Sequence, residues 1–583
     1  MAVAVGCART PPTPDRVEVL LDGSWSDPLW ATPAAPVARG GGITTSTRFQ
    51  IPEVDGGLRA DLLLEGLWWS ADVVLDGVAV GRADGGVGPV TFPLADGLAP
   101  GSHTLELTIR PPTGLHRFLV GGVPENGGSM DRPALRGPPR LVLRPADGVS
   151  SAGVRFDGRR ATAWAQVDQP REGLQVRWYT ALDGRRRTDL GVAPVDPVTG
   201  RADGPPSRLR EPPWGWGDPA LSHLNAVLED VSGNVLDTWV VRSGIRSARL
   251  LSTGLQVGDF RSPVVGLRVV DGDRAPSLLQ SMHHGARAGI NAVEVHGDTP
   301  LLAWMELTDE LGLPMVVMPR CIGRTGSLDY ASGPQKALME DQDRRIVRAV
   351  GAHPSVVAWV TEGGQRDHQG RPGHGARVEP WTSVLEADPM GRQVAGVSPR
   401  ATLVRTTDLE NLRYECPGGC SGRWLVEMTF PGGGRGEPWS LLAQAWVRAV
   451  QEGGPGGVVP KPARLDNDLW RRSFEWASRS VGATAWPLER RRRAPARVRV
   501  RGARPGDIVF VSAPGIRGRG HQAGADGLVE IDVWHAGVAT VHGPGWQREV
   551  RLDARRWEGL QRWGRVTELT APTASNTASP PRQ

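Results

Sequence analysis

The sequence predicts a multidomain protein: a jelly-roll β-sandwich, an immunoglobulin-like β-sandwich, an (α/β)8 TIM barrel and a small C-terminal β-sandwich. Three observations predict this order. The 583 residues exceed a single core, because one domain takes about 100–200 residues. The 76 glycines and 50 prolines favour many turns and therefore many short strands. Between strand-rich stretches lies a region where strands and helices alternate, which is typical of a parallel sheet.

The first two domains are predicted from alternation of apolar and polar residues. In residues 15–140, alternation is clear at 58–66 and 102–110, and Asp76-Gly77 between two short apolar runs indicates a hairpin. Residues 141–250 contain similar runs on both sides of a Ser-Gly-Asn turn. Short strands at such close spacing favour a jelly roll followed by an immunoglobulin-like sandwich.

The barrel is predicted for residues 251–488. Helical patterns cover 276–288, 300–311 and 335–350, and short apolar strands cover 292–295, 314–318 and 356–360. Within the last of these helices, Glu340, Asp341 and Asp343 suggest a face exposed to water. Repeated βα units over this length fit a closed eight-stranded barrel.

The two ends of the chain complete the expected layout. Residues 489–566 return to strands, at 496–500, 507–511 and 528–533, and predict the small C-terminal domain. Residues 567–583 are rich in Thr, Ser and Pro and predict a disordered tail. Residues 1–14 are expected to be a signal remnant or tether.

The charge pattern argues against a nucleic-acid partner. The formal net charge is +5, and the basic residues are almost all Arg, with only Lys336 and Lys461 as lysines. The single dense run, Arg490 to Arg493, could bind phosphates or could be a solvated linker at a domain boundary. The 22 tryptophans can stack on sugar rings, although most are expected to fill cores.

The N-terminus resembles the end of a bacterial lipoprotein signal. Small residues lead into Cys7, and a Pro/Thr-rich stretch follows. A lipid on Cys7 would place the protein at the cell envelope, in the periplasm or at the outer membrane; without it we expect a frayed terminus and a cytoplasmic protein. No run of about 18–20 apolar residues predicts a spanning helix.

No cofactor and no metal site are predicted. Cys416 and Cys420 could form a disulfide in an oxidising compartment, but this segment offers too few ligands for a metal ion.

A series of short motifs runs through roughly residues 17–480: Leu21–Trp25, Phe49–Pro52, Leu64–Gly66, Ala71–Gly81, Pro213–Pro219, Ser243–Arg246, Gly289–Val293, Thr308–Leu313, His353–Trp359 and Ala387–Arg392. Each motif resembles a stretch of glycoside hydrolase family 2, the group of β-galactosidases, β-glucuronidases and β-mannosidases, and together they follow the order of that family. The resemblance implies a galactose-binding-like first domain, a sugar ligand and hydrolysis of terminal β-glycosidic bonds with retention of configuration.

The resemblance also implies a pair of catalytic glutamates. Such an enzyme needs two carboxyl groups about 5–5.5 Å apart, one as nucleophile and one as acid/base. Arg423–Met428 is similar to the family's seventh barrel strand and makes Glu427 the expected nucleophile. Glu362, at the end of the fourth strand, is the candidate acid/base. Trp359, Trp424, His296 and Asp298 are expected to shape the sugar site.

Two departures from the family pattern leave a second interpretation open. Gly363 and Gly364 stand where the family has Asn-Glu, so Glu362 lies two residues early, although on the same face of the strand. Glu294 stands where the family has Arg. The alternative is therefore a catalytically inactive relative that binds glycan at the cell envelope. A purely structural envelope protein, which would bind no sugar, is a third possibility.

Overall fold

The computed structural model describes the strands of the sandwiches and part of the barrel. The described residues are 16–23, 25–26, 42–51, 58–65, 67, 70–83, 89–95, 98–110, 135, 137–145, 148–157, 160–182, 185–208, 214–215, 219–244, 248–251, 254–257, 260–262, 264–268, 291–296, 301–318, 333–362, 394–397, 423–428, 457–460, 492–513, 516, 518–553, 555–557 and 566–572.

The N-terminal domain is a two-layered sandwich, as its alternating strands predict. One layer contains β1 (Val17–Leu20), β8 (Arg140–Pro145), β3 (Leu58–Leu64) and β6 (Val90–Ala95), in that order. The other contains β2 (Ile43–Ile51), β7 (Gly101–Arg110), β4 (Ser70–Leu75) and β5 (Val78–Ala83). Apolar side chains from both layers, including Phe49, Leu62 and Leu105, form one buried core.

The predicted hairpin between β4 and β5 is confirmed. Asp76 and Gly77 join the two strands and both have positive φ angles, 50° and 79°. Positive φ at both central residues is what a tight two-residue turn requires. The Asp76 carboxylate also accepts a hydrogen bond from the Thr104 amide at 2.7 Å, so the turn is held against β7.

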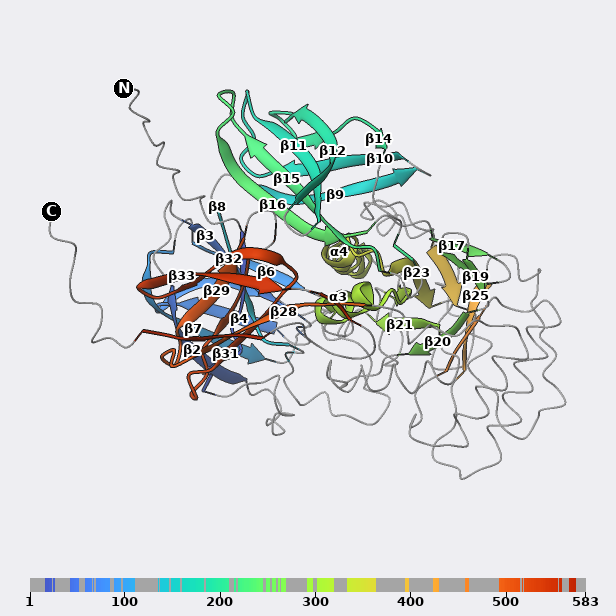
Figure 1. The fold of residues 1–583 in the computed structure, drawn as a ribbon. Helices are drawn as coiled ribbons and strands as arrows, with labels where there is room; N and C mark the ends of the chain where they lie inside the picture. Colours follow the sequence, from blue (N-terminus) through green and yellow to red (C-terminus); the bar gives the residue numbers. More distant parts are fainter. Residues whose placement is uncertain are drawn as a thin grey trace, which may run out of the picture.

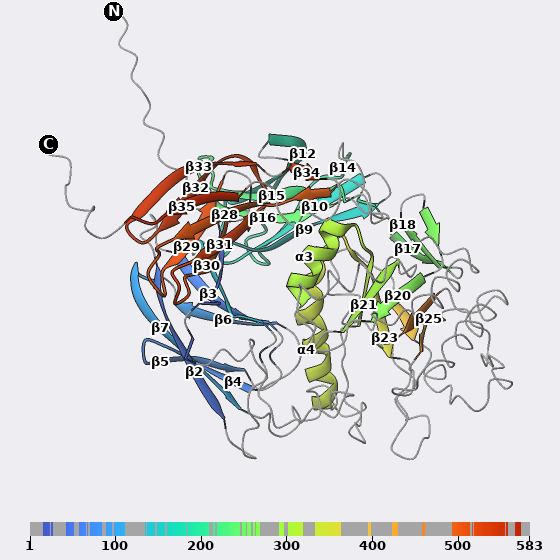
Figure 2. The same ribbon diagram turned by 60° about the horizontal axis from the view of Figure 1, so that its bottom comes forward.

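The C-terminal segment is a small sandwich, but one of its layers continues the N-terminal sheet. The strands β29 (Ile508–Ser512), β30 (Gly518–Gln522), β32 (Ala536–Gly543) and β33 (Trp546–Asp553) join β1, β8, β3 and β6 in one eight-stranded sheet. The seam is a parallel pair in which Val17 of β1 lies opposite Gly518 of β30. Figures 1 and 2 show the C-terminal strands, in red, beside the N-terminal strands, in blue.

The second layer of this C-terminal sandwich contains three strands. These are β31 (Val529–Val533), β28 (Ala496–Arg501) and β35 (Val566–Thr570), and a separate apolar core fills the space between the layers. A short pair is formed by β27 (Arg492–Ala494) and β34 (Arg555–Trp557). Arg492 and Arg493 therefore belong to a strand. Arg490 and Arg491 lie outside the described residues, and a solvated linker there stays a prediction.

The second domain is also a sandwich around one core. Its first layer contains β9 (Val149–Asp157), β10 (Arg160–Val167), β13 (Arg201–Asp203) and β14 (Ser207–Arg208). Its second contains β12 (Arg185–Pro194), β11 (Gln175–Leu182), β15 (Ser222–Glu229) and β16 (Val235–Ser243). Trp178 is fully buried between them, so this tryptophan is a core residue.

A closed ring of parallel strands follows a small antiparallel sheet. The small sheet contains β17 (Ala248–Leu251), β18 (Gly254–Val257) and β19 (Phe260–Ser262). The ring order in the described residues is β20 (Val264–Arg268), β21 (Ala292–His296), β22 (Met315–Met318), β23 (Val356–Glu362), β24 (Val394–Val397), β25 (Arg423–Met428) and β26 (Gly457–Pro460). Because β26 pairs directly with β20, seven strands close the ring in the described residues, and the eight-stranded form stays a prediction. Strand β25, expected as the seventh barrel strand, is the sixth strand of this ring.

Two helices, α3 (Leu301–Leu311) and α4 (Gly333–Val350), lie between the barrel strands and the sandwiches in both views (Figures 1 and 2). Both helices were predicted, and both present apolar residues to the interior, among them Met305 and Ile346. One detail of the prediction is wrong: Asp343 on α4 is completely buried, because it lies on the side of the helix that packs inward. Asp341 is exposed, as expected.

Charged residues on α3 join the barrel to the sandwiches. Glu306 receives two hydrogen bonds from Arg519 of β30, at 2.6 and 3.0 Å. Glu310 forms an ion pair with Arg242 of β16, and the Arg242 guanidinium lies 4.1 Å from the ring centroid of Trp534 in the C-terminal domain. One helix of the barrel therefore contacts both neighbouring sandwiches.

Candidate functional site

Three of the predicted site residues lie at the carboxyl ends of barrel strands. β21 ends at His296, β23 ends at Glu362, and β25 ends one residue after Glu427. These strands are parallel within one ring, so their carboxyl ends meet at the same rim. Active sites of such barrels form at this rim.

The hydrogen-bonded register relates His296 to Glu362. His296 pairs with Met318 of β22, and the preceding residue, Val317, pairs with Trp359 of β23. Met318 is therefore level with the position after Trp359, which lies two residues before Glu362. From β21 to β23, which are two strands apart, Glu362 therefore lies two residues closer to the carboxyl end than the position level with His296.

The same rise occurs between Glu362 and Glu427. Glu362 pairs with Val397 of β24, and Val397 pairs with Leu425 of β25. Glu427 is two residues beyond Leu425. The strands of a closed barrel are tilted relative to its axis. Residues at equal height along the axis are therefore offset in hydrogen-bonded register by about one residue from each strand to the next.

His296, Glu362 and Glu427 consequently occupy one layer of the barrel. They lie on alternate strands, and the rise of one residue per strand puts them at equal height along the barrel axis. A register difference of two residues also keeps them on the same face of the sheet. This is how the layers of a parallel barrel are built. The backbones of Glu362 and Glu427 are two strand spacings apart, about 10 Å.

The structure places two predicted tryptophans differently. Trp359 is fully buried, and it lies three residues before Glu362 in a regular part of β23, so the two positions are on opposite faces of the sheet. Trp424 lies at the start of β25, where the register with β24 shifts, and it is therefore farther from the rim than Glu427. Contact of either indole with a sugar stays a prediction.

The remaining predicted positions are only partly described. The backbone of Glu294 lies in β21 opposite Val316. Asp298, Cys7, Gly363 and Gly364 lie outside the described residues. Sugar binding by Asp298 and lipid attachment at Cys7 stay predictions.

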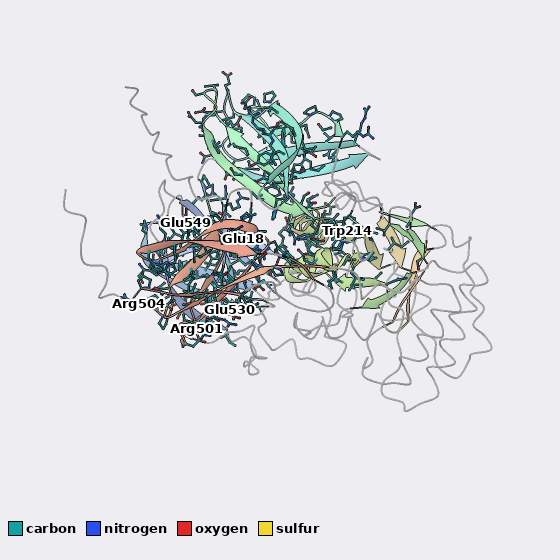
Figure 3. The ribbon with its side chains drawn as sticks, viewed as in Figure 1. Glu18, Trp214, Arg501, Arg504, Glu530 and Glu549 are labelled. Atoms are coloured by element: carbon teal, nitrogen blue, oxygen red, sulfur yellow. The ribbon has the colours of Figure 1, made fainter. Side chains whose placement is uncertain are left out.

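A pocket of about 510 Å³ lies at the seam of the shared sheet, away from the barrel rim. Its wall includes Glu18, Arg140 and Arg519; Figure 3 labels Glu18, which lies on β1. The Arg140 guanidinium lies 3.5 Å from Glu65 and 3.8 Å from Glu18. Burial lowers the pKa of Arg140, but these carboxylates outweigh burial and raise it. The sequence motifs did not indicate this network, because its members are far apart in the chain.

In the described part of the chain, no group of three His, Cys, Asp or Glu side chains has an arrangement that could hold a metal ion. Of the helices described, none is both long enough and apolar enough to cross a bilayer.

Sequence comparison provides no relative: no protein-family model matches the chain, and no curated protein matches it. Solved structures do match the fold. A family GH2 β-galacturonidase from Eisenbergiella tayi bound to galacturonate aligns over 72% of this chain and 73% of its own, with a TM-score of 0.54 and 17% identity.

Two β-glucuronidase structures align in the same way. The enzyme from Bifidobacterium dentium, complexed with coumarin-3-O-glucuronide, covers 81% of this chain and 98% of its own, with a TM-score of 0.57 and 15% identity. The enzyme from Ruminococcus gnavus, in complex with a C6-substituted uronic isofagomine, covers 80% and 88%, with a TM-score of 0.54 and 15% identity. The chain therefore has the multidomain β-sandwich fold of these glycosidase structures.

Proposed function

We propose that this protein hydrolyses terminal β-glycosidic bonds with retention of configuration, with Glu427 as the nucleophile and Glu362 as the acid/base. The observation that carries the proposal is the common layer of Glu362 and Glu427 at the carboxyl rim of the barrel. Retaining hydrolysis needs two carboxyl groups about 5–5.5 Å apart, and side chains from alternate strands of one layer can converge to that distance.

Each residue has one chemical task in this proposal. The Glu427 carboxylate attacks the anomeric carbon, and the bond to the leaving oxygen breaks as Glu362 donates its proton to that oxygen. Glu362 then removes a proton from water, which attacks the anomeric carbon and releases Glu427. His296, in the same layer, would donate a hydrogen bond to a sugar hydroxyl.

The fold neighbours suggest which sugars to test first. Their structures hold galacturonate, a coumarin glucuronide and D-glucuronic acid. We infer that a β-linked uronide is a substrate candidate for this chain, beside the neutral β-galactosides and β-mannosides that the sequence motifs imply.

The alternative function is glycan binding without hydrolysis, and one observation favours it. Gly363 and Gly364 occupy the sequence positions where the family that this chain resembles has Asn-Glu. In this alternative Glu362 does not donate a proton. Loss of general acid catalysis costs about 10²–10⁴-fold in rate.

The test is hydrolysis of nitrophenyl and methyl β-glycosides, both uronides and neutral sugars, by wild type, Glu427→Gln and Glu362→Gln. Glu549→Gln, an exposed position on β33 (Figure 3), is the matched control. Nitrophenolate leaves readily without a proton, so Glu362→Gln should lower methyl glycoside turnover by about 10²–10⁴-fold and nitrophenyl glycoside cleavage much less. Glu427→Gln should abolish both.

Three outcomes separate the possibilities. Equal loss on both leaving groups in Glu362→Gln would exclude it as the acid. No turnover by wild type, together with sugar binding in calorimetry, would support the glycan-binding alternative. If the wild type neither hydrolyses nor binds any tested sugar, both functions are contradicted and a structural role is left.

A further inference from the structure

The height of Glu362 in the barrel depends on how β23 begins. Met315 of β22 pairs with Val356, but the next residue, Val316, pairs with Ala358. Val357 is therefore an extra residue, which forms a β-bulge at the start of the pairing between β22 and β23. A slip of one residue at this point would shift the rest of β23 by about 3.3 Å and reverse its faces. The register selected here therefore decides whether Glu362 is level with Glu427.

Asp309, on the barrel helix α3, holds the residues immediately before this bulge. Its Oδ1 accepts a hydrogen bond from the Ser355 amide at 2.9 Å. Its Oδ2 lies 2.6 Å from Nδ1 of His353. Both carboxylate oxygens are thus used on the segment that enters β23. Asp309 is almost completely buried and Ser355 completely so, so water does not compete for these bonds.

Neighbouring bonds fix Asp309 and Ser355 themselves. The Asp309 carbonyl accepts a hydrogen bond from Nε1 of Trp214 at 2.9 Å, and Figure 3 shows Trp214 where the second sandwich meets the barrel helices. The Thr308 hydroxyl donates to Oγ of Ser355 at 3.0 Å. The Ser355 carbonyl accepts from the Met315 amide at 2.6 Å. The start of β23 is therefore held by α3, by β22 and, through Trp214, by the second sandwich.

We propose that Asp309 is a positioning residue that selects the bulged register of β23 and so sets the height of Glu362 relative to Glu427. The inference rests on the proposed function for its catalytic consequence, but the register itself can be measured without activity. Asp309 acts at the amino end of β23, whereas Glu362 lies at the carboxyl end of the same strand.

The first experiment measures amide hydrogen exchange over residues 353–362 in wild type, Asp309→Ala and Asp309→Asn. Glu306→Gln is the matched control, because Glu306 lies on the same helix but bonds Arg519 of the C-terminal domain. Asp309→Ala should speed exchange in β23 by about tenfold or more, which corresponds to local opening. Asp309→Asn keeps an acceptor for the Ser355 amide and should have a smaller effect. Glu306→Gln should leave β23 unchanged.

The second experiment separates positioning from general stability. Well below the unfolding temperature, Asp309→Ala should lower kcat by about 10- to 100-fold, since a 1 Å misplacement can cost 10²-fold, while KM changes little. Thr308→Val, which removes the hydroxyl bonds to Ser355 Oγ and to the Met305 carbonyl but leaves Asp309 in place, provides a milder variant if Asp309→Ala does not fold.

Each result decides the inference. Faster exchange in β23 of the Asp309 variants but not of Glu306→Gln supports the register role even if wild type proves inactive, in which case only the proposed function fails. Unchanged exchange in β23 of both Asp309→Ala and Thr308→Val would overturn the inference. So would an Asp309→Ala variant with lower unfolding temperature but wild-type kcat and wild-type exchange in β23.

Discussion

Glu306 shows how one residue acquires a role from its tertiary surroundings. Burial raises the pKa of this carboxyl, but the guanidinium groups of Arg519 and Arg140 outweigh burial and hold the pKa at about 2. Because the folded-state pKa lies below the ordinary value of 4.5, the charged form stabilises the fold above pH 4.5. That contribution is lost as the pH falls towards 2. The side chain is 33% exposed, so solvent screens part of the interaction.

We predict that Glu306→Gln lowers the free energy of unfolding at pH 7 by about 1 kcal/mol, because Arg519 loses its bidentate partner. The difference from wild type should shrink between about pH 4.5 and pH 2, because over this range Glu306 takes up a proton in the unfolded chain before it does so in the folded protein. Urea unfolding at several pH values measures this. Glu340→Gln on α4, which pairs with Arg344, is the control. A difference independent of pH would show that the charge of Glu306 is not the stabilising feature.

At the scale of a single element, β28 illustrates how alternation serves two purposes. Ala496, Val498 and Val500 are fully buried in the C-terminal core. The arginines between them pair across the sheet on its other face: Arg497 with Asp532 at 2.7 Å and with Glu530 at 2.8 Å. Arg499 and Arg501 continue the series with Glu530 on β31 and Glu568 on β35. Opposite charges on adjacent strands stabilise the pairing of β28 with both neighbours.

We predict that Arg497→Gln lowers the free energy of unfolding by about 0.5–1 kcal/mol at low salt, because it removes two cross-strand ion pairs. The effect should fall at 1 M NaCl, where the Debye length is about 3 Å rather than about 10 Å at 0.1 M. Urea midpoints at the two salt concentrations measure it. Arg548→Gln, an exposed position on the edge strand β33, should show little change. A salt-independent loss would indicate that Arg497 acts through packing of its apolar stem instead.

At the scale of the whole molecule, the shared eight-stranded sheet makes the two ends of the chain one structural unit. Strand β1 is bonded on one side to β8 and on the other to β30. Ile508 and Phe510 of the C-terminal segment belong to the N-terminal core. Strand β30 needs a small residue where it lies beside β29: a Cβ atom added to Gly520 would lie 2.7 Å from the carbonyl oxygen of Val509 and 2.7 Å from Cβ of Phe510.

We predict that Gly520→Ala destabilises the protein by about 1–3 kcal/mol through overpacking, and that β1 and β8 loosen together with β29 and β30. Hydrogen exchange of Val17–Leu20 and Arg140–Pro145 measures the N-terminal response. Gly524→Ala is the matched control, because an added Cβ there would meet only Asp526 at an ordinary 3.4 Å. Faster exchange confined to the C-terminal strands would contradict one cooperative sheet.

The sequence by itself determined the local elements. Alternation predicted β7 and β28, Asp76-Gly77 predicted the hairpin, and helical periodicity predicted α3 and α4. These succeed because a turn or a periodic face depends on residues only a few positions apart. The sequence also placed Glu362 and Glu427 at strand ends, since each follows a short apolar run.

Only the tertiary structure decided how these elements meet. β30, with the sequence Gly-Arg-Gly-His-Gln, has no strand-like pattern, and its glycines serve the close approach to β1 and β29. The common height of Glu362 and Glu427 follows from hydrogen bonds among β23, β24 and β25 and from the bulge at Val357. Register between strands is set by partners distant in the chain, so no local pattern could have revealed it.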